Sequence, residues 1–221
     1  MKTKVEANKL ITLRNPRSPI SEQFRNIRTN LDFSNMNLAH QTIMITSADP
    51  ATGKSTIAAN LAVVCANNGK KTLLIDADLR KPSQSRYFPS ANGSGLTDEL
   101  IGRIPWTDSV ITTDIDNLFV LSAGTIPPSP AELLASPAFK ALLKTLSENF
   151  DQIIIDTPPV LAVTDAQIIA TLVDGTLLVV RSKYTKVENA KKTISKLQTN
   201  HANIIGCVLN QVKSKEENYY Y

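Results

Sequence analysis

Runs of apolar, mostly β-branched residues alternate along the chain with longer segments in which apolar residues recur at helical spacing. The runs predict β-strands at residues 42–46, 72–75, 118–121, 152–155, 176–180 and 204–209. Several are apolar throughout, which is typical of parallel strands covered on both faces. Helices are predicted between them at residues 55–67, 131–149, 165–172 and 187–199. This order predicts an α/β domain with a doubly wound, mostly parallel sheet, helices on both faces and right-handed crossovers.

A further helix is predicted near residues 19–33, before the first strand. Ser18 is expected to cap it and Pro19 to be its first residue, because the fixed φ of proline suits that position. Apolar side chains at helical spacing predict one buried face: Ile20, Phe24, Ile27 and Leu31. A stripe away from that face carries Glu22, Arg25 and Arg28. On spacing alone, a solvated stripe is favoured over a subunit interface.

The segment between the first strand and the next helix is typical of a phosphate-binding loop. Residues 47–56 read Ser-Ala-Asp-Pro-Ala-Thr-Gly-Lys-Ser-Thr, which matches G-x-x-x-x-G-K-[ST] except that Ala48 replaces the first glycine. Backbone N–H groups of such a loop and the start of the following helix hold a polyphosphate. Lys54 is expected to reach the β/γ-phosphates and the Ser55 hydroxyl to bind Mg²⁺. The predicted fold is therefore a P-loop NTPase.

Acidic residues follow two of the predicted strands. Asp76 and Asp78 come directly after residues 72–75, and Asp156 follows residues 152–155. Ligands of open parallel sheets bind outside the carboxyl ends of the strands, where Lys54 and Ser55 are also expected. A single Asp there is usually a turn former or a helix cap. Because Mg²⁺ keeps several waters, we expect Ser55 to bind it directly and Asp76 and Asp156 mainly through water, which leaves Asp78 as a general base.

Composition and charge narrow the choice of function. The 221 residues suit one domain. The net charge is +4, and the positive residues are scattered along the chain without a basic stripe interleaved with aromatics. No nucleic-acid binding is therefore predicted. No segment is apolar enough for a bilayer span or a signal peptide, and we expect a cytoplasmic protein. Cys65 and Cys207 are predicted to be buried, reduced thiols.

The chain ends in three consecutive tyrosines, Tyr219, Tyr220 and Tyr221. Chemistry alone leaves two interpretations equally open: a terminus that is disordered or strapped onto a surface groove, and a set of phosphate acceptors. The predicted organisation is an N-terminal extension at residues 1–17, a nucleotide-binding domain at residues 18–212 and a tyrosine-bearing tail at residues 213–221.

Taken together, these motifs resemble the bacterial tyrosine kinases that accompany capsule and exopolysaccharide synthesis. The resemblance covers nearly the whole chain and is carried by the Glu-x-x-Arg-x-x-Arg helix, the loop and the acidic strand ends, with the tyrosine tail. It also includes residues 123–124, 127–128, 154–159 and 164–166. The combination is far more specific than any single motif.

The resemblance implies an ATP-dependent protein-tyrosine autokinase. Its implied roles are phosphate and Mg²⁺ binding by Lys54, Ser55 and Thr56, ordering of the metal by Asp76 and Asp156, and deprotonation of tyrosine by Asp78. It implies that Arg80 supports the phosphates or the acidic strand end. The predicted nucleotide-binding residues are Asp49, Pro50, Ala51, Thr52, Gly53, Lys54, Ser55, Thr56 and Asn210.

The resemblance also implies partners. The helix with Glu22, Arg25 and Arg28 would pack against a neighbouring subunit in a homo-oligomeric ring, which reverses the interpretation from spacing alone. Tail tyrosines of one subunit would enter the active site of the next. A membrane-anchored activator would recruit the chain to the inner face of the membrane. A cognate tyrosine phosphatase and protein substrates of polysaccharide synthesis complete the implied set.

One departure from the family pattern keeps other functions open. Ala51 stands where the family usually has glycine, and we expect alanine to be tolerated there only with a negative φ. An ATPase switch like those of cell division and plasmid partition has the same fold, but residues 48–50 lack the extra lysine that those proteins carry early in the loop. A degenerate nucleotide-binding module that only tethers partners is supported mainly by Ala51.

Overall fold

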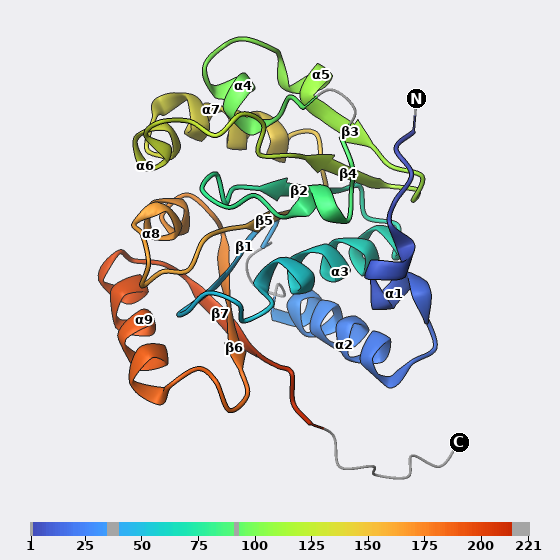
Figure 1. Ribbon diagram of the computed structural model, residues 1–221, viewed down its shortest axis with the longest axis vertical. Helices are drawn as coiled ribbons and strands as arrows, with labels where there is room; N and C mark the ends of the chain where they lie inside the picture. Colours follow the sequence, from blue (N-terminus) through green and yellow to red (C-terminus); the bar gives the residue numbers. More distant parts are fainter. Residues whose placement is uncertain (1, 35–39, 91–92, 214–221) are drawn as a thin grey trace.

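The computed structural model describes residues 2–34, 40–90 and 93–213, which form a single sheet with helices on both faces (Figure 1). The strand order is β3-β4-β2-β5-β1-β6-β7. The strands are β1 (Thr42–Ser47), β2 (Thr72–Asp76), β3 (Val110–Thr112), β4 (Leu118–Leu121), β5 (Gln152–Asp156), β6 (Gly175–Arg181) and β7 (Ile204–Asn210). Only the β3–β4 pair is antiparallel among these strands. The doubly wound α/β fold is therefore confirmed.

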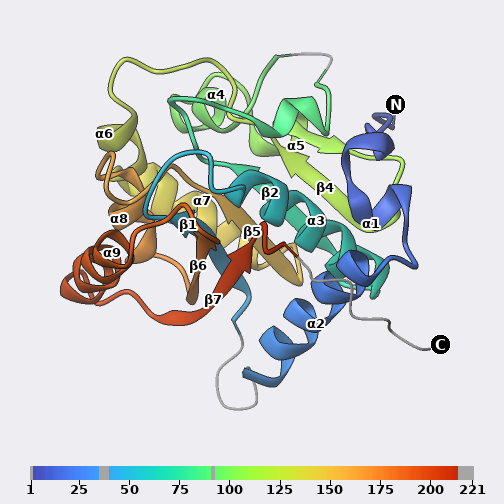
Figure 2. The ribbon, with the colours of Figure 1, turned by 60° about the horizontal axis from the view of Figure 1, so that its bottom comes forward.

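Two helical layers cover the sheet. The helices are α1 (Ile11–Arg14), α2 (Pro19–Ser34), α3 (Lys54–Asn67), α4 (Leu96–Leu100), α5 (Trp106–Ser109), α6 (Pro130–Leu134), α7 (Pro137–Ser147), α8 (Asp165–Ala170) and α9 (Val187–Thr199), with 3₁₀ turns η1 (Ala7–Lys9) and η2 (Gln84–Arg86). Helices α1, α2 and α3 share one hydrophobic core, and α4, α6, α7, α8 and α9 share the other. Figures 1 and 2 both place α1 and α2 against α3. The sheet is thus buried between two apolar layers, which explains its continuously apolar central strands.

Several elements differ from the sequence prediction. The helix expected at residues 131–149 is two helices, because Ser136 precedes Pro137 and takes an extended conformation with ψ of 152°. Ser136 caps α7, since its hydroxyl accepts a hydrogen bond from the Phe139 N–H. The short elements α4, α5 and β3 were not predicted. Strand β3 is a half-exposed edge of three residues, so it lacks the apolar signal of the central strands.

Helix α2 begins at Pro19 as predicted, with the Ser18 hydroxyl accepting a hydrogen bond from the Ser21 N–H. Phe24 and Leu31 are buried, but the predicted burial of Ile20 is wrong, because that side chain is 59% exposed. In the first turn of α2 it is Ser21 that points inward. The Ser21 hydroxyl lies 2.7 Å from the Asn15 carbonyl oxygen and 3.1 Å from the Ile11 carbonyl oxygen. Polar contacts with α1 therefore replace an apolar contact at this end of the helix.

The N-terminal extension packs on the domain. Val5 and Leu10 are buried in the same core as α3, and Thr12 donates hydrogen bonds to the Asn60 side chain through both its N–H and its hydroxyl. The boundary predicted at residue 17 stays a prediction, but the segment before it contributes to the core. Among the described residues, no helix combines the length and apolar character needed to cross a membrane.

The two cysteines differ in burial. Cys65 on α3 is buried as predicted, and burial raises the pKa of its thiol to about 12. The predicted burial of Cys207 is wrong, because β7 is the last strand of the described sheet and this side chain is exposed. The tail tyrosines lie outside the described residues.

Candidate active site

The carboxyl ends of β1, β2 and β5 meet at one edge of the sheet, and the loop of residues 48–53 leaves β1 at that edge. Asp76 and Asp156 are register partners at the ends of β2 and β5. Ile45 of β1 is the register partner of Asp156 on its other side. Because parallel strands end together, two acids 80 positions apart in sequence lie next to the phosphate-binding loop.

Gly53 joins the loop to α3 in a conformation that only glycine adopts without strain. Its φ is 92°, and a Cβ at this position would collide with the Asn210 side chain. Asn210 donates a hydrogen bond of 2.8 Å to the Thr52 carbonyl oxygen. Asn210 therefore supports the loop from the end of β7, and its direct contact with nucleotide stays a prediction.

The rest of the loop is held from both sides. The Asn189 amide donates to the Asp49 carboxylate at 2.8 Å, and the Arg181 guanidinium donates to the Ala51 carbonyl oxygen at 3.1 Å. The expectation that Ala51 needs a negative φ is wrong, because its φ is 56°. A left-handed backbone costs an alanine roughly 1–2 kcal/mol, so the surrounding hydrogen bonds hold a strained residue.

Replacing Ala51 with glycine is expected to raise the free energy of unfolding by about 1 kcal/mol, because released strain exceeds the added entropy of the unfolded chain. Ala48→Gly is the matched control. Ala48 is buried in the same loop and is not among the residues with positive φ, so the change should lower stability. Denaturant unfolding measures both variants. Equal destabilisation by the two changes would contradict the strain at Ala51.

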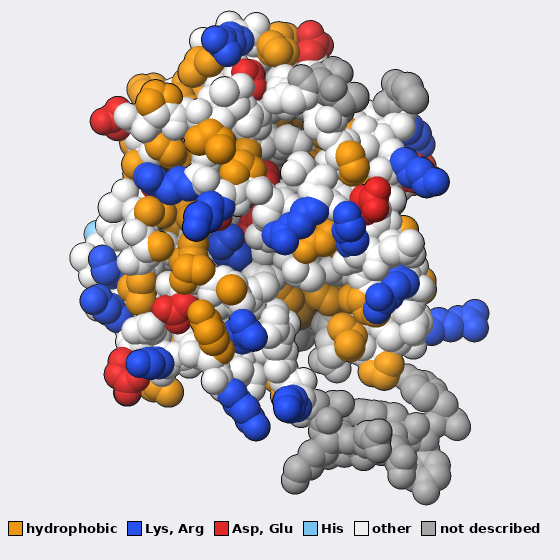
Figure 3. All heavy atoms as spheres, viewed as in Figure 1, with side chains coloured by type: hydrophobic (Ala, Val, Ile, Leu, Met, Phe, Trp, Pro, Cys, Tyr) orange, Lys and Arg blue, Asp and Glu red, His pale blue; other side chains and the backbone are white. Residues whose placement is uncertain are grey.

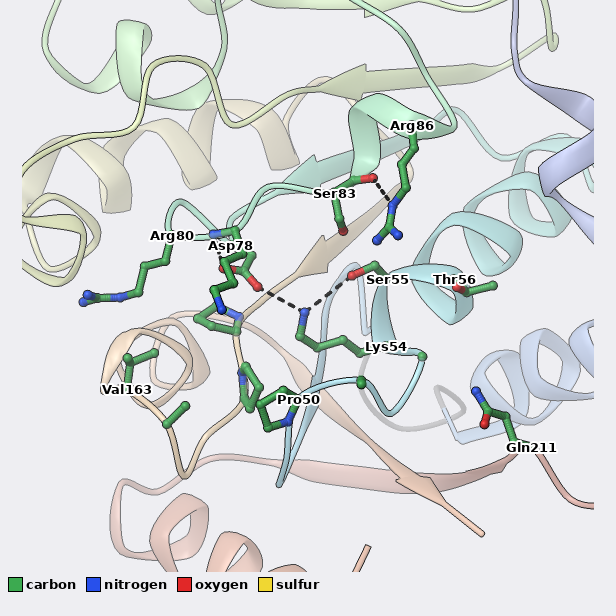
Figure 4. Close-up of a pocket in the computed structure, with 16 residues that line it drawn as sticks. Pro50, Lys54, Ser55, Thr56, Asp78, Arg80, Ser83, Arg86, Val163 and Gln211 are labelled. Carbon is green, nitrogen blue, oxygen red and sulfur yellow. Dashed lines mark hydrogen bonds and ion pairs between the residues drawn. The ribbon is translucent and has the colours of Figure 1, made fainter. Parts of the chain in front are cut away.

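Lys54 lies among the acidic strand ends. Its Nζ is 3.1 Å from Oδ2 of Asp78 and 3.4 Å from the Ser55 hydroxyl (Figure 4). The same Nζ is 3.8 Å from Oδ1 of Asp156. The Asp156 side chain is fully buried, and those of Lys54 and Asp78 are nearly so. The structure thus brings together Lys54, Ser55, Asp78 and Asp156, the residues on which the predicted kinase chemistry depends.

Asp76 is held by the backbone that follows it. Its Oδ2 accepts hydrogen bonds from the N–H groups of Ser83 at 2.8 Å and Gln84 at 2.9 Å. Burial, with the nearby charge of Asp156, raises the pKa of Asp76 to about 7. Burial also raises the pKa of Asp156, although the Lys54 charge opposes this. Burial lowers the pKa of Lys54, but attraction to Asp156 and Asp78 outweighs it and the net shift is upward.

These shifts predict that acidification stabilises the protein in the absence of nucleotide and Mg²⁺. Between an ordinary pKa of 3.8 and the folded value of about 7, the folded state holds a proton on Asp76 that the unfolded state has lost. The free energy of unfolding should therefore fall as pH rises through this window, by up to about 1.4 kcal/mol per pH unit. Unfolding in EDTA at pH 5 to 8 measures it. Asp76→Asn should flatten the slope, and an unchanged slope would contradict this assignment.

The oxygen-rich cluster fits a hard cation. Oδ1 of Asp156 is buried and makes no hydrogen bond within the described part of the chain. In the same part of the chain, no three His, Cys, Asp or Glu side chains form a complete metal-binding group. Mg²⁺ takes one or two protein oxygens together with phosphate and water, so Ser55, Asp76 and Asp156 suit a metal that arrives with a nucleotide.

Known proteins match this chain over the part that contains these residues. A family model described as an AAA domain matches residues 40–210. The tyrosine-protein kinase YwqD of Bacillus subtilis is 45% identical over 96% of this chain and 90% of its own length. The crystal structure of the chimerical protein CapA2B2 superposes with a TM-score of 0.90 at 43% identity, covering 97% of this chain and 95% of that one.

The chain belongs to the bacterial tyrosine kinase family. The kinase domain of the Escherichia coli tyrosine kinase ETK is a further structural relative, with a TM-score of 0.88, 32% identity and coverage of 96% of this chain and 84% of that one. The family predicted from the sequence is confirmed, and so is the P-loop fold with its nucleotide-binding loop. The cell-division ATPase MinD of Pyrococcus furiosus is more distant, with a TM-score of 0.67 at 28% identity over 80% of this chain and 74% of that one.

A cavity of about 420 Å³ opens between the phosphate-binding loop and the segment after β2. Its lining includes Pro50, Lys54 and Thr56 from the loop and the start of α3, and Pro158 and Val163 from the segment after β5. The sequence did not predict that Lys81, Ser83 and Arg86 also line it. Figure 3 shows Lys and Arg side chains gathered across the middle of one face of the molecule. Lys81 and Arg86 are exposed, so basic side chains border a pocket whose lining also includes Asp78.

Arg80 lines the same pocket but points away from Lys54 (Figure 4). Its guanidinium donates to both carboxylate oxygens of Asp165, at 2.8 and 3.0 Å, and the Asp165 side chain is fully buried. This bidentate pair ties the turn after β2 to the start of α8. A contact between Arg80 and phosphate stays a prediction.

The stripe on α2 is partly exposed. The Arg25 guanidinium donates to the Glu22 carboxylate at 2.8 Å and to the Pro16 carbonyl oxygen at 2.7 Å. The Arg28 guanidinium lies 3.7 Å from the Asp32 carboxylate. These contacts hold the Arg25 and Arg28 side chains close to α2. The role of Glu22, Arg25 and Arg28 as a subunit interface stays a prediction.

Proposed function

We propose that this chain transfers the γ-phosphate of Mg-ATP to tyrosines at the carboxyl terminus of another copy of itself. The observation that carries the proposal is the convergence of Lys54, Ser55, Asp78 and Asp156 behind the phosphate-binding loop. By analogy with its relatives, the reaction would regulate the synthesis and export of capsular or extracellular polysaccharide. The acceptors are Tyr219, Tyr220 and Tyr221.

Phosphoryl transfer depends mainly on positioning and on neutralising charge at the transferring group. The loop N–H groups and Lys54 would bind the β- and γ-phosphate oxygens, with Ser55, Asp76 and Asp156 holding the metal directly or through water. Bound Mg²⁺ would supply additional neutralisation of the phosphate charge. Turning of Lys54 from Asp78 toward the phosphates would release Asp78 to act as a base.

The tyrosine oxygen forms a bond to the γ-phosphorus while the bond to the β–γ bridging oxygen breaks, which leaves ADP. Asp78 accepts the phenol proton and later releases it to water. Because the phenol has a pKa near 10, a base within reach favours this step at neutral pH.

The proposed partners follow from the same assignment. Helix α2, through Glu22, Arg25 and Arg28, would pack against the next subunit in a homo-oligomeric ring. A membrane-anchored activator would recruit the chain to the inner face of the cell membrane, and a cognate tyrosine phosphatase would reverse the reaction. Other protein substrates would belong to polysaccharide synthesis.

Phosphate on the tail would also control assembly. Each phosphotyrosine adds about −1.5 to −2 charges, which Asp76, Asp78 and Asp156 would repel. Accumulated phosphate would therefore release the tail and loosen the ring. The variant in which all three tail tyrosines are phenylalanine should keep its assembly state when ATP is added, whereas the wild type should dissociate. Identical behaviour of the two would refute this switch.

The decisive experiment is incubation with Mg-ATP followed by mass mapping of phosphotyrosine, alone and with an added activator peptide. Mixing a tyrosine-less chain with an Asp78→Asn chain tests transfer between subunits, because only the second can accept phosphate. Phosphotyrosine on the tail supports the kinase. ATP turnover without phosphotyrosine favours an ATPase switch, and nucleotide binding without turnover favours a tethering module.

A further inference from the structure

One buried glutamine contacts three of the residues placed at the candidate metal site. Gln84 lies in η2, directly after the turn that follows β2, and its side chain is fully buried. Its Nε2 donates to Oδ2 of Asp156 at 2.8 Å and to the carbonyl oxygen of Ser55 at 3.1 Å. Its backbone N–H donates to Oδ2 of Asp76 at 2.9 Å.

The two protons of the Gln84 amide have separate acceptors on two elements. One acceptor is the carboxylate at the end of β5, and the other is the backbone of the first turn of α3, whose Ser55 hydroxyl faces Lys54. The amide therefore fixes the spacing between these two elements. Its acceptors also fix the orientation of the amide, because a flipped amide would place Oε1 against the Asp156 carboxylate.

The hydrogen bond from Gln84 to Oδ2 of Asp156 leaves Oδ1 as the carboxylate oxygen that is available to a metal. Oδ1 is buried and makes no hydrogen bond within residues 2–34, 40–90 and 93–213, and Lys54 Nζ lies 3.8 Å from it. A carboxylate held at one oxygen by an amide presents the other in a fixed direction. Oriented donors of this kind around a metal-binding carboxylate commonly change metal affinity tenfold to a hundredfold when they are removed.

We propose that Gln84 is a positioning residue for the metal of the phosphotransfer reaction. Its side chain holds Asp156 and the Ser55 backbone at a fixed separation, and its backbone N–H, together with that of Ser83, holds Asp76. One short 3₁₀ turn thus organises all three proposed metal-binding residues. This inference rests on the proposed binding of Mg-nucleotide at the loop.

Gln84→Met tests the proposal, because methionine fills a similar volume and has no donor. Gln152→Met is the matched control. Gln152 is also buried, and its Nε2 donates to the carbonyl oxygens of His40 at 3.1 Å and Gln41 at 2.9 Å. It lies at the start of β5, whereas Asp156 lies at its end. Gln84→Met loses two amide hydrogen bonds, and Gln152→Met loses three, because Gln152 Oε1 also accepts one from Lys70 Nζ at 3.3 Å. Only the Gln84 bonds lie at the proposed site.

The measurement is the Mg²⁺ concentration that gives half-maximal binding of a fluorescent ATP analogue, followed by kcat for tail phosphorylation. Gln84→Met should raise the half-saturating Mg²⁺ about 10- to 100-fold. Binding of the same analogue in EDTA should change less than threefold. Gln152→Met should match the wild type in its Mg²⁺ requirement, even if both variants unfold at a lower temperature.

Gln84→Asn provides a second variant if methionine prevents folding. It keeps both donors but withdraws them by one methylene, so its Mg²⁺ requirement should rise by a smaller factor. A Mg²⁺ requirement within twofold of wild type in a folded Gln84 variant would overturn the positioning role and leave the kinase proposal intact. If the wild type binds the nucleotide analogue equally well with and without Mg²⁺, both the positioning role of Gln84 and the kinase proposal are wrong.

Discussion

Lys54→Met should reduce tail phosphorylation by a factor on the order of 10³ or more and destabilise the folded protein. Lys54 is the cation that lies among Asp78 at 3.1 Å and Asp156 at 3.8 Å, in a site with little access to water. Loss of one preorganised charge at a transferring phosphate removes roughly 10³–10⁵ of rate in related phosphotransfer reactions. Removal of one partner from a buried ion pair costs about 3–5 kcal/mol, because it leaves a buried charge uncompensated.

The stability loss should depend on pH. The Lys54 charge lowers the pKa of Asp156 against the effect of burial, so its removal raises that pKa further. A protonated Asp156 needs no cation, and the destabilisation should therefore be smaller at pH 5.5 than at pH 8. Denaturant unfolding in EDTA at both values, with phosphotyrosine quantified in parallel, measures the two effects.

Lys70→Met is the control for the loss of a lysine ion pair. Lys70 Nζ lies 2.6 Å from the Asp32 carboxylate, but both side chains are about a third exposed. Such a pair contributes about 1 kcal/mol or less, and the change should leave phosphorylation near the wild-type level. More than a tenth of wild-type activity in Lys54→Met would refute the role of its charge in transfer.

The sequence was sufficient for the parts of the site that follow from parallel strands. Asp76 and Asp156 end continuously apolar runs, and the carboxyl ends of parallel strands must lie at one edge of a sheet. Gly53, Lys54 and Ser55 stand at fixed positions between a strand and a helix, where backbone geometry determines their direction. The order of elements alone therefore predicts that these residues lie together.

Residues whose role depends on tertiary contacts were not predicted. Gln84 lies in an irregular segment, and nothing in its neighbours indicates that its amide would reach both β5 and α3. Arg80 was linked to phosphate or to the acidic strand end, but its guanidinium pairs with Asp165, 85 positions away in the sequence. The positive φ of Ala51 likewise depends on contacts from distant segments, including Arg181. The local sequence pattern carries no information about these contacts between residues that are far apart in the sequence.

Asp78→Asn should lower kcat by about 10² to 10⁴ while leaving the affinity for Mg-ATP within a few fold of wild type. Asp78 sits at the rim of the cluster, where Oδ2 lies 3.1 Å from Lys54 Nζ and Oδ1 accepts the Lys81 N–H at 3.0 Å. Asparagine keeps the shape of the side chain and can still accept the hydrogen bond from Lys81. It cannot take a proton from tyrosine, and a positioned general base contributes a factor of this size.

Asp98→Asn is the matched control, because Asp98 is also a nearly buried carboxylate that accepts a backbone N–H, from Gly95 at 3.1 Å. It caps α4 away from the phosphate-binding loop, so its loss should lower stability without a specific fall in kcat. Single-turnover phosphorylation at saturating Mg-ATP separates the chemical step from binding. If Asp78→Asn instead weakens Mg-ATP binding in proportion to its loss of rate, Asp78 serves the nucleotide or its metal. The proton acceptor for tyrosine would then have to be another group.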